Sequence, residues 1–268
     1  NLVREAQTLR YNNVVTELVY NELYNNESHV APKSEIKDIQ KKVNLKFDNI
    51  NLSNVSYLYP GTSENIFENI NLEINQGDKL GLIGQSGSGK TTLINLITGL
   101  IEPQKGIIKI NNKNLNESLK EFQNTIGYVS QSVYLADESF KFNIALNNIN
   151  EKINIDRVNH LIKILDLEKL IYKKKDGIDS IVGEKGIQIS GGQIQRIGIA
   201  RAMYNNPEIL ILDEATNALD EVTQDKVLKN IIYEMKNKTV ISISHNEDTL
   251  KYCNKIFSVS KNEIKKIN

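Results

Sequence analysis

The sequence predicts an α/β fold with a mostly parallel sheet, an N-terminal antiparallel β-subdomain and a helical subdomain. Apolar side chains with the period of a strand occupy residues 43–76 and are separated by turn residues. Apolar strands then alternate with helical segments from residue 79 onward, as in a parallel sheet covered on both faces. A helix-rich, turn-poor block from about 140 to 175 places the helical subdomain at about 132–192.

Residues 1–28 are expected to form an amphipathic helix. Apolar side chains recur there at spacings of three and four, the period of one helix face. They are Leu2, Ala6, Leu9, Tyr11, Val15, Val19 and Leu23. Residues 29–42 are polar, contain Pro32 and are predicted to be a linker, so the main domain spans residues 43–268.

The first strands of the main domain follow a period of two. Apolar or aromatic side chains alternate at Leu45 and Phe47, then at Val55, Tyr57 and Tyr59, then at Ile70, Leu72 and Ile74. Turn signals separate them at residues 60–61 and follow them at 76–78. Short strands joined by turns favour antiparallel pairing, so a small antiparallel sheet is expected before residue 79.

Residues 84–91 match the pattern G-x-x-x-x-G-K-[ST], between an apolar strand at 79–83 and a helical run at 92–97. In such a loop the backbone N–H groups surround phosphate oxygens, Lys90 reaches the terminal phosphates and the Thr91 hydroxyl can hold Mg²⁺. A glycine-rich turn that matches by chance is the alternative, expected in about one in a hundred chains of this length. The loop therefore predicts a P-loop NTPase core that binds a nucleotide. The expected contacts are Gly84, Gln85, Ser86, Gly87, Ser88, Gly89, Lys90, Thr91 and Thr92.

The second half of the chain supplies the other strands and a pair of carboxylates. Strands are predicted at 107–110, 126–130, 209–212, 240–244 and 256–259, and helices at 193–204 and 221–236. Asp213 and Glu214 follow a solidly apolar strand. Behind a phosphate loop, the first would help to hold Mg²⁺ and the second would orient the attacking water. Taken alone, the pair would fit an ordinary acidic helix start equally well.

Composition excludes several classes of protein. Lys plus Arg and Asp plus Glu balance at 33 each, so no global field would recruit nucleic acid. The single cysteine, Cys253, excludes an internal disulfide framework and fits a reducing compartment, where a buried apolar role is expected for it. No stretch approaches the ~20 apolar residues that span a bilayer. Because the chain starts at Asn1 rather than methionine, we expect a soluble segment excised from a parent chain with membrane segments.

Seven short elements are spread over the region from Val43 to the C-terminus. They are Tyr59 before Pro60, the loop at 84–91, Gln131 after Tyr128-Val129-Ser130, Ile189-Ser190-Gly191-Gly192-Gln193, the strand end at 209–214, Asn217-Ala218-Leu219-Asp220, and His245 after Ile243-Ser244. In this order they resemble the nucleotide-binding domain of ABC transporters. The sequence departs from the family pattern at Ile189, where Leu is usual, and at Asn217, where Ser is common.

The resemblance implies ATP and Mg²⁺ as ligands and a role for each element. Tyr59 would stack on adenine, and Thr91, Gln131 and Asp213 would bind the metal. Glu214, His245, Gln131 and Lys90 would be catalytic, with His245 sensing the γ-phosphate. Ser190, Gly191, Gly192, Gln193 and Asp220 would contact the nucleotide held by a second copy, in a head-to-tail homodimer.

Each of these residues also has a purely structural interpretation. Residues 190–193 could be a flexible turn with a helix cap. His245 could be an ordinary core or surface histidine, and Gln131 a polar residue that ends a strand. Tyr59 could belong to the core, because Tyr57 two residues earlier shares its sheet face.

Within that family the residues favour an exporter. Val182-Gly183-Glu184-Lys185-Gly186 resembles a short element that exporters carry immediately before the family's signature motif, which residues 189–193 resemble; importers generally lack its Gly-Glu pair. Residues 134–137 and 143–145 are also similar to exporters. The helix at 1–28 would then be the end of the last membrane helix or, alternatively, a helix packed on its own domain.

The resemblance implies an ATPase domain at the cytoplasmic face of the cell (inner) membrane. It would work with transmembrane domains of the same parent chain to move a lipid-like, glycolipid or peptide substrate. Residues 11–24 are weakly similar to flippases of lipid-linked oligosaccharides. The alternatives are a soluble ABC ATPase without transport, which usually carries two cassettes or a long coiled coil, and a nucleotide sensor, which the intact Lys90 and Glu214 disfavour.

Overall fold

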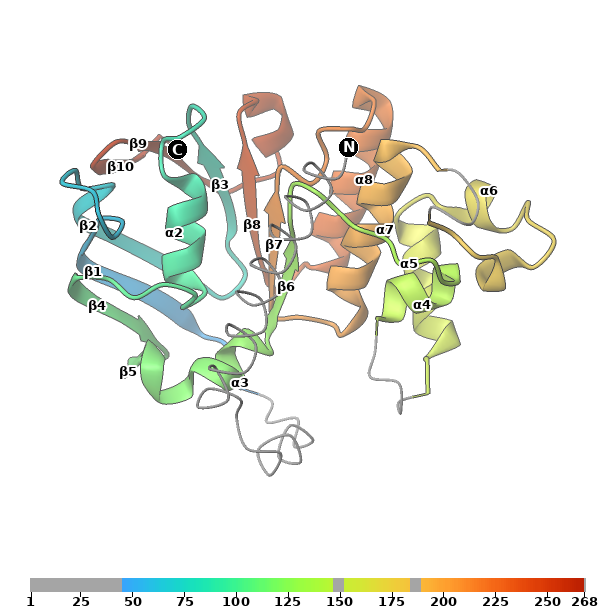
Figure 1. Cartoon of the computed structure of the whole chain (residues 1–268), viewed down its shortest axis with the longest axis horizontal. Helices are drawn as coiled ribbons and strands as arrows, with labels where there is room; N and C mark the ends of the chain where they lie inside the picture. The colour runs from blue at the N-terminus through green and yellow to red at the C-terminus, as the bar shows by residue number, and fades with distance from the viewer. Residues whose placement is uncertain (1–44, 147–151, 184–188, 268) are drawn as a thin grey trace, which may run out of the picture. The chain divides into compact units, whose positions relative to one another are not determined.

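The computed structural model describes residues 45–146, 152–183 and 189–267 (Figure 1). Its larger sheet has six strands in the order β10-β9-β3-β8-β7-β6. The strands are β3 (Lys79–Ile83), β6 (Ile126–Val129), β7 (Ile209–Asp213), β8 (Thr239–Ser244), β9 (Lys255–Ser260) and β10 (Glu263–Lys266). All neighbouring pairs from β9 to β6 are parallel, and β10 joins β9 antiparallel. The predicted mostly parallel sheet is confirmed.

Strand β7 shows why this sheet needs continuous apolar runs. It is buried along its whole length. Ile209 and Ile211 face one core, which contains helix α2, whereas Leu210 and Leu212 face the other core, which contains helices α7 and α8. Each such side chain contributes about 1.5–3 kcal/mol when it is fully buried. A strand covered on both faces therefore reads as an unbroken hydrophobic segment.

The second sheet is antiparallel and has four strands in the order β2-β1-β4-β5. The strands are β1 (Asn49–Tyr57), β2 (Phe67–Asn75), β4 (Lys105–Ile110) and β5 (Lys113–Asn114). The antiparallel subdomain is confirmed, but it also recruits β4, which we expected among the strands of the alternating half. β4 pairs with β1 and sets Ile110 opposite Ile50 and Ile108 opposite Leu52, so all four side chains enter one core.

The strand predicted at residues 45–47 does not form. The Asn111 side chain binds the backbone here and at the start of β1: its Oδ1 accepts hydrogen bonds from the Asp48 and Asn49 N–H groups at 2.8 and 3.2 Å. Its Nδ2 donates to the Lys46 carbonyl at 2.5 Å. A side chain therefore satisfies backbone groups that a neighbouring strand would otherwise have paired.

Helix α2 (Lys90–Ile97) lies between the two sheets (Figure 1). Its Leu93, Ile94, Leu96 and Ile97 are buried in one core with side chains from both sheets. A 3₁₀ turn (Leu115–Ser118) and helix α3 (Leu119–Gln123) follow β5 and lead into β6. Because α2 starts directly after the phosphate loop, its packing on both sheets fixes the direction in which its N-terminus points.

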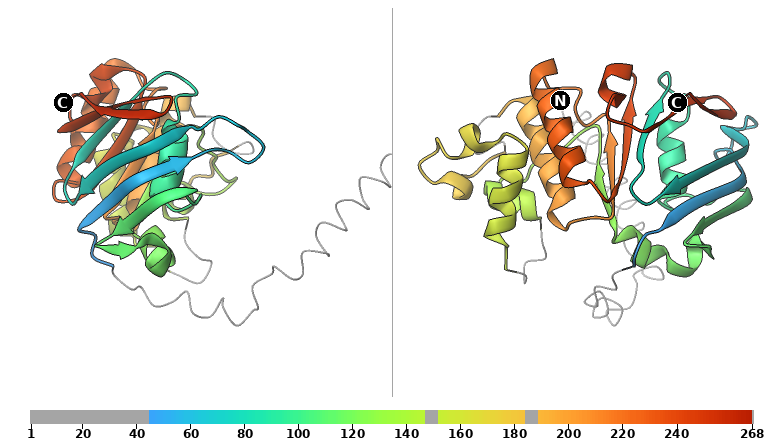
Figure 2. Two further views of the ribbon diagram at one scale, coloured as in Figure 1. Left: turned by 90° about the vertical axis from the view of Figure 1, so that its left-hand side faces the viewer. Right: turned by 180° about the vertical axis from the view of Figure 1, so that it is seen from behind.

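Helices α7 (Gly191–Tyr204) and α8 (Glu221–Glu234) cover the other face of the six-stranded sheet (Figure 2). Beside them lie α4 (Phe140–Ala145), α5 (Ile155–Ile164), α6 (Glu168–Ile171) and 3₁₀ turns at Gly177–Asp179 and Glu247–Leu250. Val158 and Leu161 of α5 share a core with Ile197 of α7. In the described part of the helix-rich block there are three short helices, while the subdomain boundary at 132–192 stays a prediction.

Several predictions fall outside the described residues. These are the helix at 1–28, the linker at 29–42 and residues 184–186 of the exporter-like element. Among the residues that are described, no helix is long and apolar enough to cross a membrane.

Candidate nucleotide-binding site

The phosphate loop joins β3 to α2, and its glycines are required by geometry. Gly87 and Gly89 have φ of 78° and 102°, which L side chains rarely adopt. A Cβ on Gly84 would lie 2.3 Å from the Val259 carbonyl oxygen, and one on Gly89 would lie 2.9 Å from Phe67. No side chain caps the N-terminus of α2, so its first N–H groups are available to an anion.

The side chains of this loop include donors that suit phosphate oxygens. Lys90 is buried, and its ammonium donates to the Gly84 and Gln85 carbonyls at 2.7 and 2.8 Å, so it lies across the loop. The buried Ser88 hydroxyl has no hydrogen-bond partner among the described residues, and a phosphate oxygen would satisfy it. Gln85, Ser86 and Thr91 are exposed.

Tyr59 lies beside the first turn of α2. Its hydroxyl shares a hydrogen bond with the Thr92 hydroxyl at 2.9 Å, and its ring meets Tyr57 edge to face with the centroids 5.2 Å apart. Tyr59 is 39% exposed whereas Tyr57 is 6% exposed. Tyr57 therefore belongs to the core, and the ring of Tyr59 is accessible next to the loop.

Asp213 ends β7 on the face of the sheet that carries α2. It is 9% exposed, and its Oδ2 accepts a hydrogen bond from the Tyr128 hydroxyl at 2.8 Å. Burial raises the pKa of Asp213, the Tyr128 bond and the Lys90 charge lower it, and the Glu214 charge raises it further, with a net rise. The Lys90 charge therefore opposes the effect of burial on this carboxyl pKa.

Glu214 is held in an unusual backbone conformation. Its φ is 51°, in the left-handed region that a non-glycine residue adopts at a cost of about 1–3 kcal/mol. Its Oε2 accepts hydrogen bonds from the amides of Gln131 and Asn217, both at 3.0 Å. The Nδ1 of His245 lies 3.7 Å from Oε1. The structure thus brings together Glu214, Gln131 and His245, which the sequence singled out separately.

The signature motif begins helix α7. Ser190 caps it: the hydroxyl accepts from the Gln193 N–H at 3.4 Å, and the Gln193 side chain accepts from the Ser190 N–H at 2.9 Å. Gln193 therefore has a capping role here. A Cβ on Gly192 would lie 2.8 Å from the Ala218 carbonyl, so this glycine permits close contact with the segment after β7.

The neighbouring segment is fixed in the same way. The Ala218 N–H donates to the Gln195 side chain at 3.0 Å, and Asp220 caps α8 by accepting from the Thr223 N–H at 3.0 Å. That backbone bond lowers the pKa of Asp220. Within the described residues, no hydrogen bond or ion pair joins residues 190–193 or Asp220 to the phosphate loop.

Two contacts of the site were not predicted. Tyr128 binds Asp213, and Asn217 binds Glu214, although the sequence suggested only that Asn217 departs from a family pattern. The alternation of β6 offered a signal for Tyr128: it is 43% exposed and stands between the buried Gly127 and Val129. Which carboxylate it reaches depends on strand pairing, which the alternation does not reveal.

The chemistry of the residues fits a magnesium nucleotide. Free N–H groups and the Lys90 ammonium suit phosphate oxygens. A carboxylate at Asp213, a hydroxyl at Thr91 and an amide oxygen at Gln131 are the hard oxygen ligands that Mg²⁺ prefers, together with substrate phosphates. Glu214 is a carboxylate held beside these groups by hydrogen bonds, as a residue that orients water requires.

Comparison with known proteins agrees with this geometry. Residues 67–217 match the family described as ABC transporter. The chain is 39% identical over 225 residues to an ATP-dependent lipid A-core flippase of Wigglesworthia glossinidia brevipalpis, covering 83% of this chain and 38% of the flippase. It is 38% identical over 217 residues to an alpha-hemolysin translocation ATP-binding protein of Escherichia coli, covering 81% of this chain and 30% of that protein.

Among solved structures, a bacterial Atm1-family ABC exporter with ATP bound superposes with a TM-score of 0.75 at 27% identity. That comparison covers 82% of this chain and 39% of the exporter chain. The chain spans less than half the length of each of these relatives. On the match of residues 67–217 and the geometry of the phosphate loop, the chain belongs to the ABC transporter family and contains its ATP-binding ATPase domain.

Proposed function

We propose that this domain hydrolyses ATP with Mg²⁺ and thereby drives a membrane exporter. The observation that carries the proposal is the arrangement of Glu214. Its strained backbone and two amide hydrogen bonds hold one carboxylate close to His245 and directly after Asp213. Positioning of this kind, rather than covalent chemistry, is what phosphoryl transfer to water needs from a protein.

Each group of residues has a separate role. Residues 84–92 bind the phosphates through backbone N–H groups and the Lys90 ammonium, and the accessible Tyr59 ring supports the adenine. Thr91, Gln131 and Asp213 would hold Mg²⁺, which would neutralise the charge that develops on the phosphates. Glu214 orients water and accepts its proton, and His245 senses the γ-phosphate.

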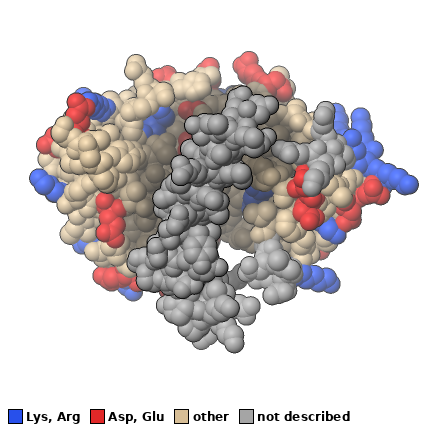
Figure 3. Space-filling model, viewed as in Figure 1, with Lys and Arg blue, Asp and Glu red and all other residues tan. Residues whose placement is uncertain are grey.

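We further propose that two copies pair head to tail. Ser190 and Gly191 are exposed at the N-terminus of α7, and the Ser190 hydroxyl keeps its proton free to donate, because it accepts in the cap. These groups and Asp220 serve the nucleotide of the partner copy. Basic and acidic side chains both occur on the face shown in Figure 3, and Lys plus Arg balance Asp plus Glu at 33 each, which favours a protein partner over nucleic acid.

The transport role rests on the relatives. The names of these relatives describe a lipid A-core flippase, a hemolysin translocation protein and an exporter. We infer that this domain lies at the cytoplasmic face of the cell membrane, works with transmembrane domains of the same parent chain, and moves a lipid-like, glycolipid or peptide substrate.

Replacement of Glu214 tests the ATPase proposal. Glu214→Gln should keep nucleotide affinity and lower turnover by roughly 10²–10⁴-fold, the usual effect of a positioned base. The matched control is Glu73→Gln, which changes an exposed carboxylate of the antiparallel sheet. Phosphate release and titration with a fluorescent ATP analogue measure both quantities. Normal turnover in Glu214→Gln would assign the role to another residue, with His245 the first candidate.

The transport proposal has a separate test. We expect the gene region that encodes this domain to encode, in the same reading frame, about six apolar segments of ~20 residues each. Their absence would contradict the exporter assignment and leave the ATPase proposal intact.

A further inference from the structure

Tyr128 occupies a defined place at the edge of the six-stranded sheet. β6 is the last strand in the order, and it pairs in parallel with β7 so that Tyr128 stands opposite Ile211. Opposite residues of paired strands point to the same face, and so do residues two apart along one strand. Tyr128, Ile211 and Asp213 therefore share the face that carries α2 and the phosphate loop.

The register explains how the side chain reaches Asp213. Asp213 lies two residues further along β7 than Ile211, which makes it the diagonal neighbour of Tyr128 across the two strands. Long aromatic side chains can span such a diagonal. The hydroxyl donates to Oδ2 of Asp213 at 2.8 Å, while much of the residue, 43%, stays exposed at the sheet edge.

Asp213 depends on this bond. It is 9% exposed, and a buried carboxylate without donors is costly. Among the residues that the structure describes, the Tyr128 hydroxyl provides the hydrogen bond to this side chain. Because the donor occupies Oδ2, the carboxylate is held in one orientation and Oδ1 is left to a further ligand.

We propose that Tyr128 is a positioning residue for the metal ligand Asp213, and that its hydroxyl sets how tightly the site takes up Mg²⁺ with ATP. This inference rests on the proposed role of Asp213 and adds a residue to it. Partners that orient a ligating carboxylate typically change metal affinity by 10–100-fold when they are removed. A tyrosine whose ring merely covered the sheet edge would have no such effect, because phenylalanine covers the same surface.

The full chain with Tyr128→Phe tests the inference by binding rather than turnover. The affinity for a fluorescent ATP analogue is measured over a range of Mg²⁺ concentrations and with chelator, and bound Mn²⁺ is counted by electron paramagnetic resonance. We expect the half-saturating metal concentration to rise by about 10-fold or more, with affinity in chelator unchanged. Tyr233→Phe is the control, because Tyr233 is 81% exposed on α8.

A second comparison separates positioning from general damage. If Tyr128 acts through Asp213, adding Tyr128→Phe to Asp213→Asn should change metal uptake no further. If nucleotide affinity depends on Mg²⁺ equally in Tyr128→Phe and in wild type, the inference is overturned but the proposed metal site is not. The same follows if Tyr128→Phe loses nucleotide affinity equally with and without metal. A wild-type chain that binds nucleotide without any response to Mg²⁺ would instead overturn the proposed metal site, and the inference with it.

Discussion

Glu214 receives two amide hydrogen bonds on the same carboxylate oxygen, from Gln131 and Asn217. The two donors come from different parts of the chain, one after β6 and one in the turn after β7. Together they resist rotation of the carboxylate, and the left-handed backbone at φ 51° fixes where its Cβ projects. The orientation of this residue is thus set by its neighbours as well as by its own rotamer.

Asn217 should therefore matter for turnover and not for nucleotide binding. Asn217→Ala removes one donor, and we expect kcat to fall by roughly 10-fold or more with little change in KM, since a small misplacement of a reacting group is costly. Asn217→Asp places a like charge beside Glu214 and should reduce kcat further. Steady-state kinetics and thermal unfolding would check this, and a wild-type kcat in Asn217→Ala would remove Asn217 from the positioning of Glu214.

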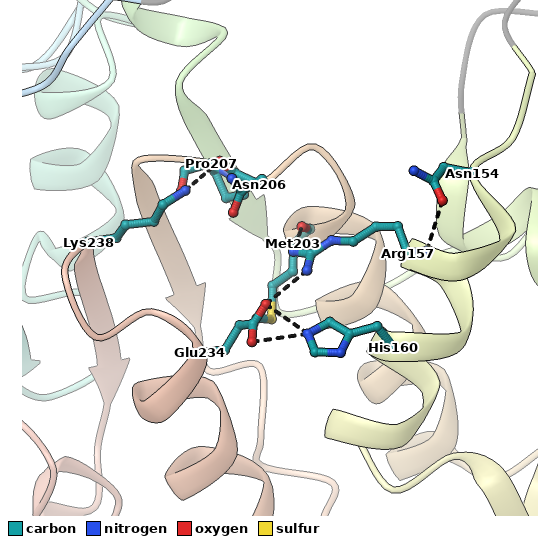
Figure 4. Close-up of polar contacts among 8 residues, drawn as sticks. All are labelled: Asn154, Arg157, His160, Met203, Asn206, Pro207, Glu234 and Lys238. Carbon is teal, nitrogen blue, oxygen red and sulfur yellow. Dashed lines mark hydrogen bonds and ion pairs between the residues drawn. The ribbon is translucent and has the colours of Figure 1, made fainter.

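The elements meet in a polar cluster between α5, α7 and α8 (Figure 4). Arg157 of α5 donates to Glu234 of α8 at 2.8 Å and to the Met203 carbonyl of α7 at 2.8 Å. His160 lies 3.1 Å from both Glu234 oxygens. The Arg157 and Glu234 side chains are 19% and 22% exposed, so the cluster ties the helical region to the helix that packs on the sheet.

This cluster should make stability depend on pH. Burial raises the pKa of Glu234, but the hydrogen bonds from Arg157 and His160 outweigh it, and the net shift is downward. A carboxyl whose folded pKa is depressed stabilises the fold above its unfolded pKa of about 4.3, and this contribution is lost as pH falls through the folded value. Glu234→Gln should thus cost about 1–3 kcal/mol at pH 7.

Urea unfolding at several pH values measures the difference in unfolding free energy between wild type and Glu234→Gln. The gap in unfolding free energy between wild type and Glu234→Gln should narrow as the pH falls from about 4.3 through the lower folded pKa, because the unfolded chain takes up the proton first and the native carboxylate follows. Glu263→Gln, in an exposed ion pair with Lys265, is the control and should change stability by less than about 1 kcal/mol. A gap that stays constant down to the acid transition would contradict a role for the Glu234 charge.

The sequence predicted an element correctly where the signal for it was local. The run Ile209–Leu212 predicted a buried strand because both of its faces are covered. Glycines predicted the loop because Gly84 and Gly89 leave no room for a side chain, and Gly87 and Gly89 have positive φ. β4 was predicted as a strand but assigned to the wrong sheet, because periodicity reports burial and not the pairing partner.

Contacts between distant segments were the part that the sequence could not give. Tyr128 meets Asp213 across 85 positions of sequence, through a strand register that only the folded sheet defines. The strand expected at 45–47 failed for the same kind of reason, since Asn111 reaches back over more than 60 positions to bind the Lys46 carbonyl. Motif residues are recognised by spacing, whereas their supporting partners come from tertiary structure.

At the scale of the whole molecule, the two halves of the proposed catalytic site are not joined within one copy. The phosphate loop precedes α2, whereas Ser190 and Gly192 lie at the start of α7. Among the described residues, no hydrogen bond or ion pair joins the loop to this helix start. If a second copy completes each site, specific ATPase activity should rise with protein concentration, because the competent dimer forms by mass action. Phosphate release measured alongside sizing checks this; flat specific activity in a monomeric species would contradict the paired site.

Complementation between two inactive variants gives the sharpest test of the head-to-tail pair. Ser190→Arg should abolish turnover and leave ATP binding intact, since the change lies outside the residues that bind the copy's own nucleotide. Glu214→Gln should also be inactive, because it removes the proposed base from the other half of the site. In a mixed dimer, one site combines the intact Glu214 of the first variant with the intact Ser190 of the second. Equal mixtures should therefore recover up to about a quarter of the wild-type rate by random pairing.

A mixture of Ser190→Arg with Lys90→Ala should recover activity in the same way, whereas Glu214→Gln with Lys90→Ala should not, because both lesions lie in the same half. Recovery in that last mixture, or none in the first two, would overturn the proposed arrangement.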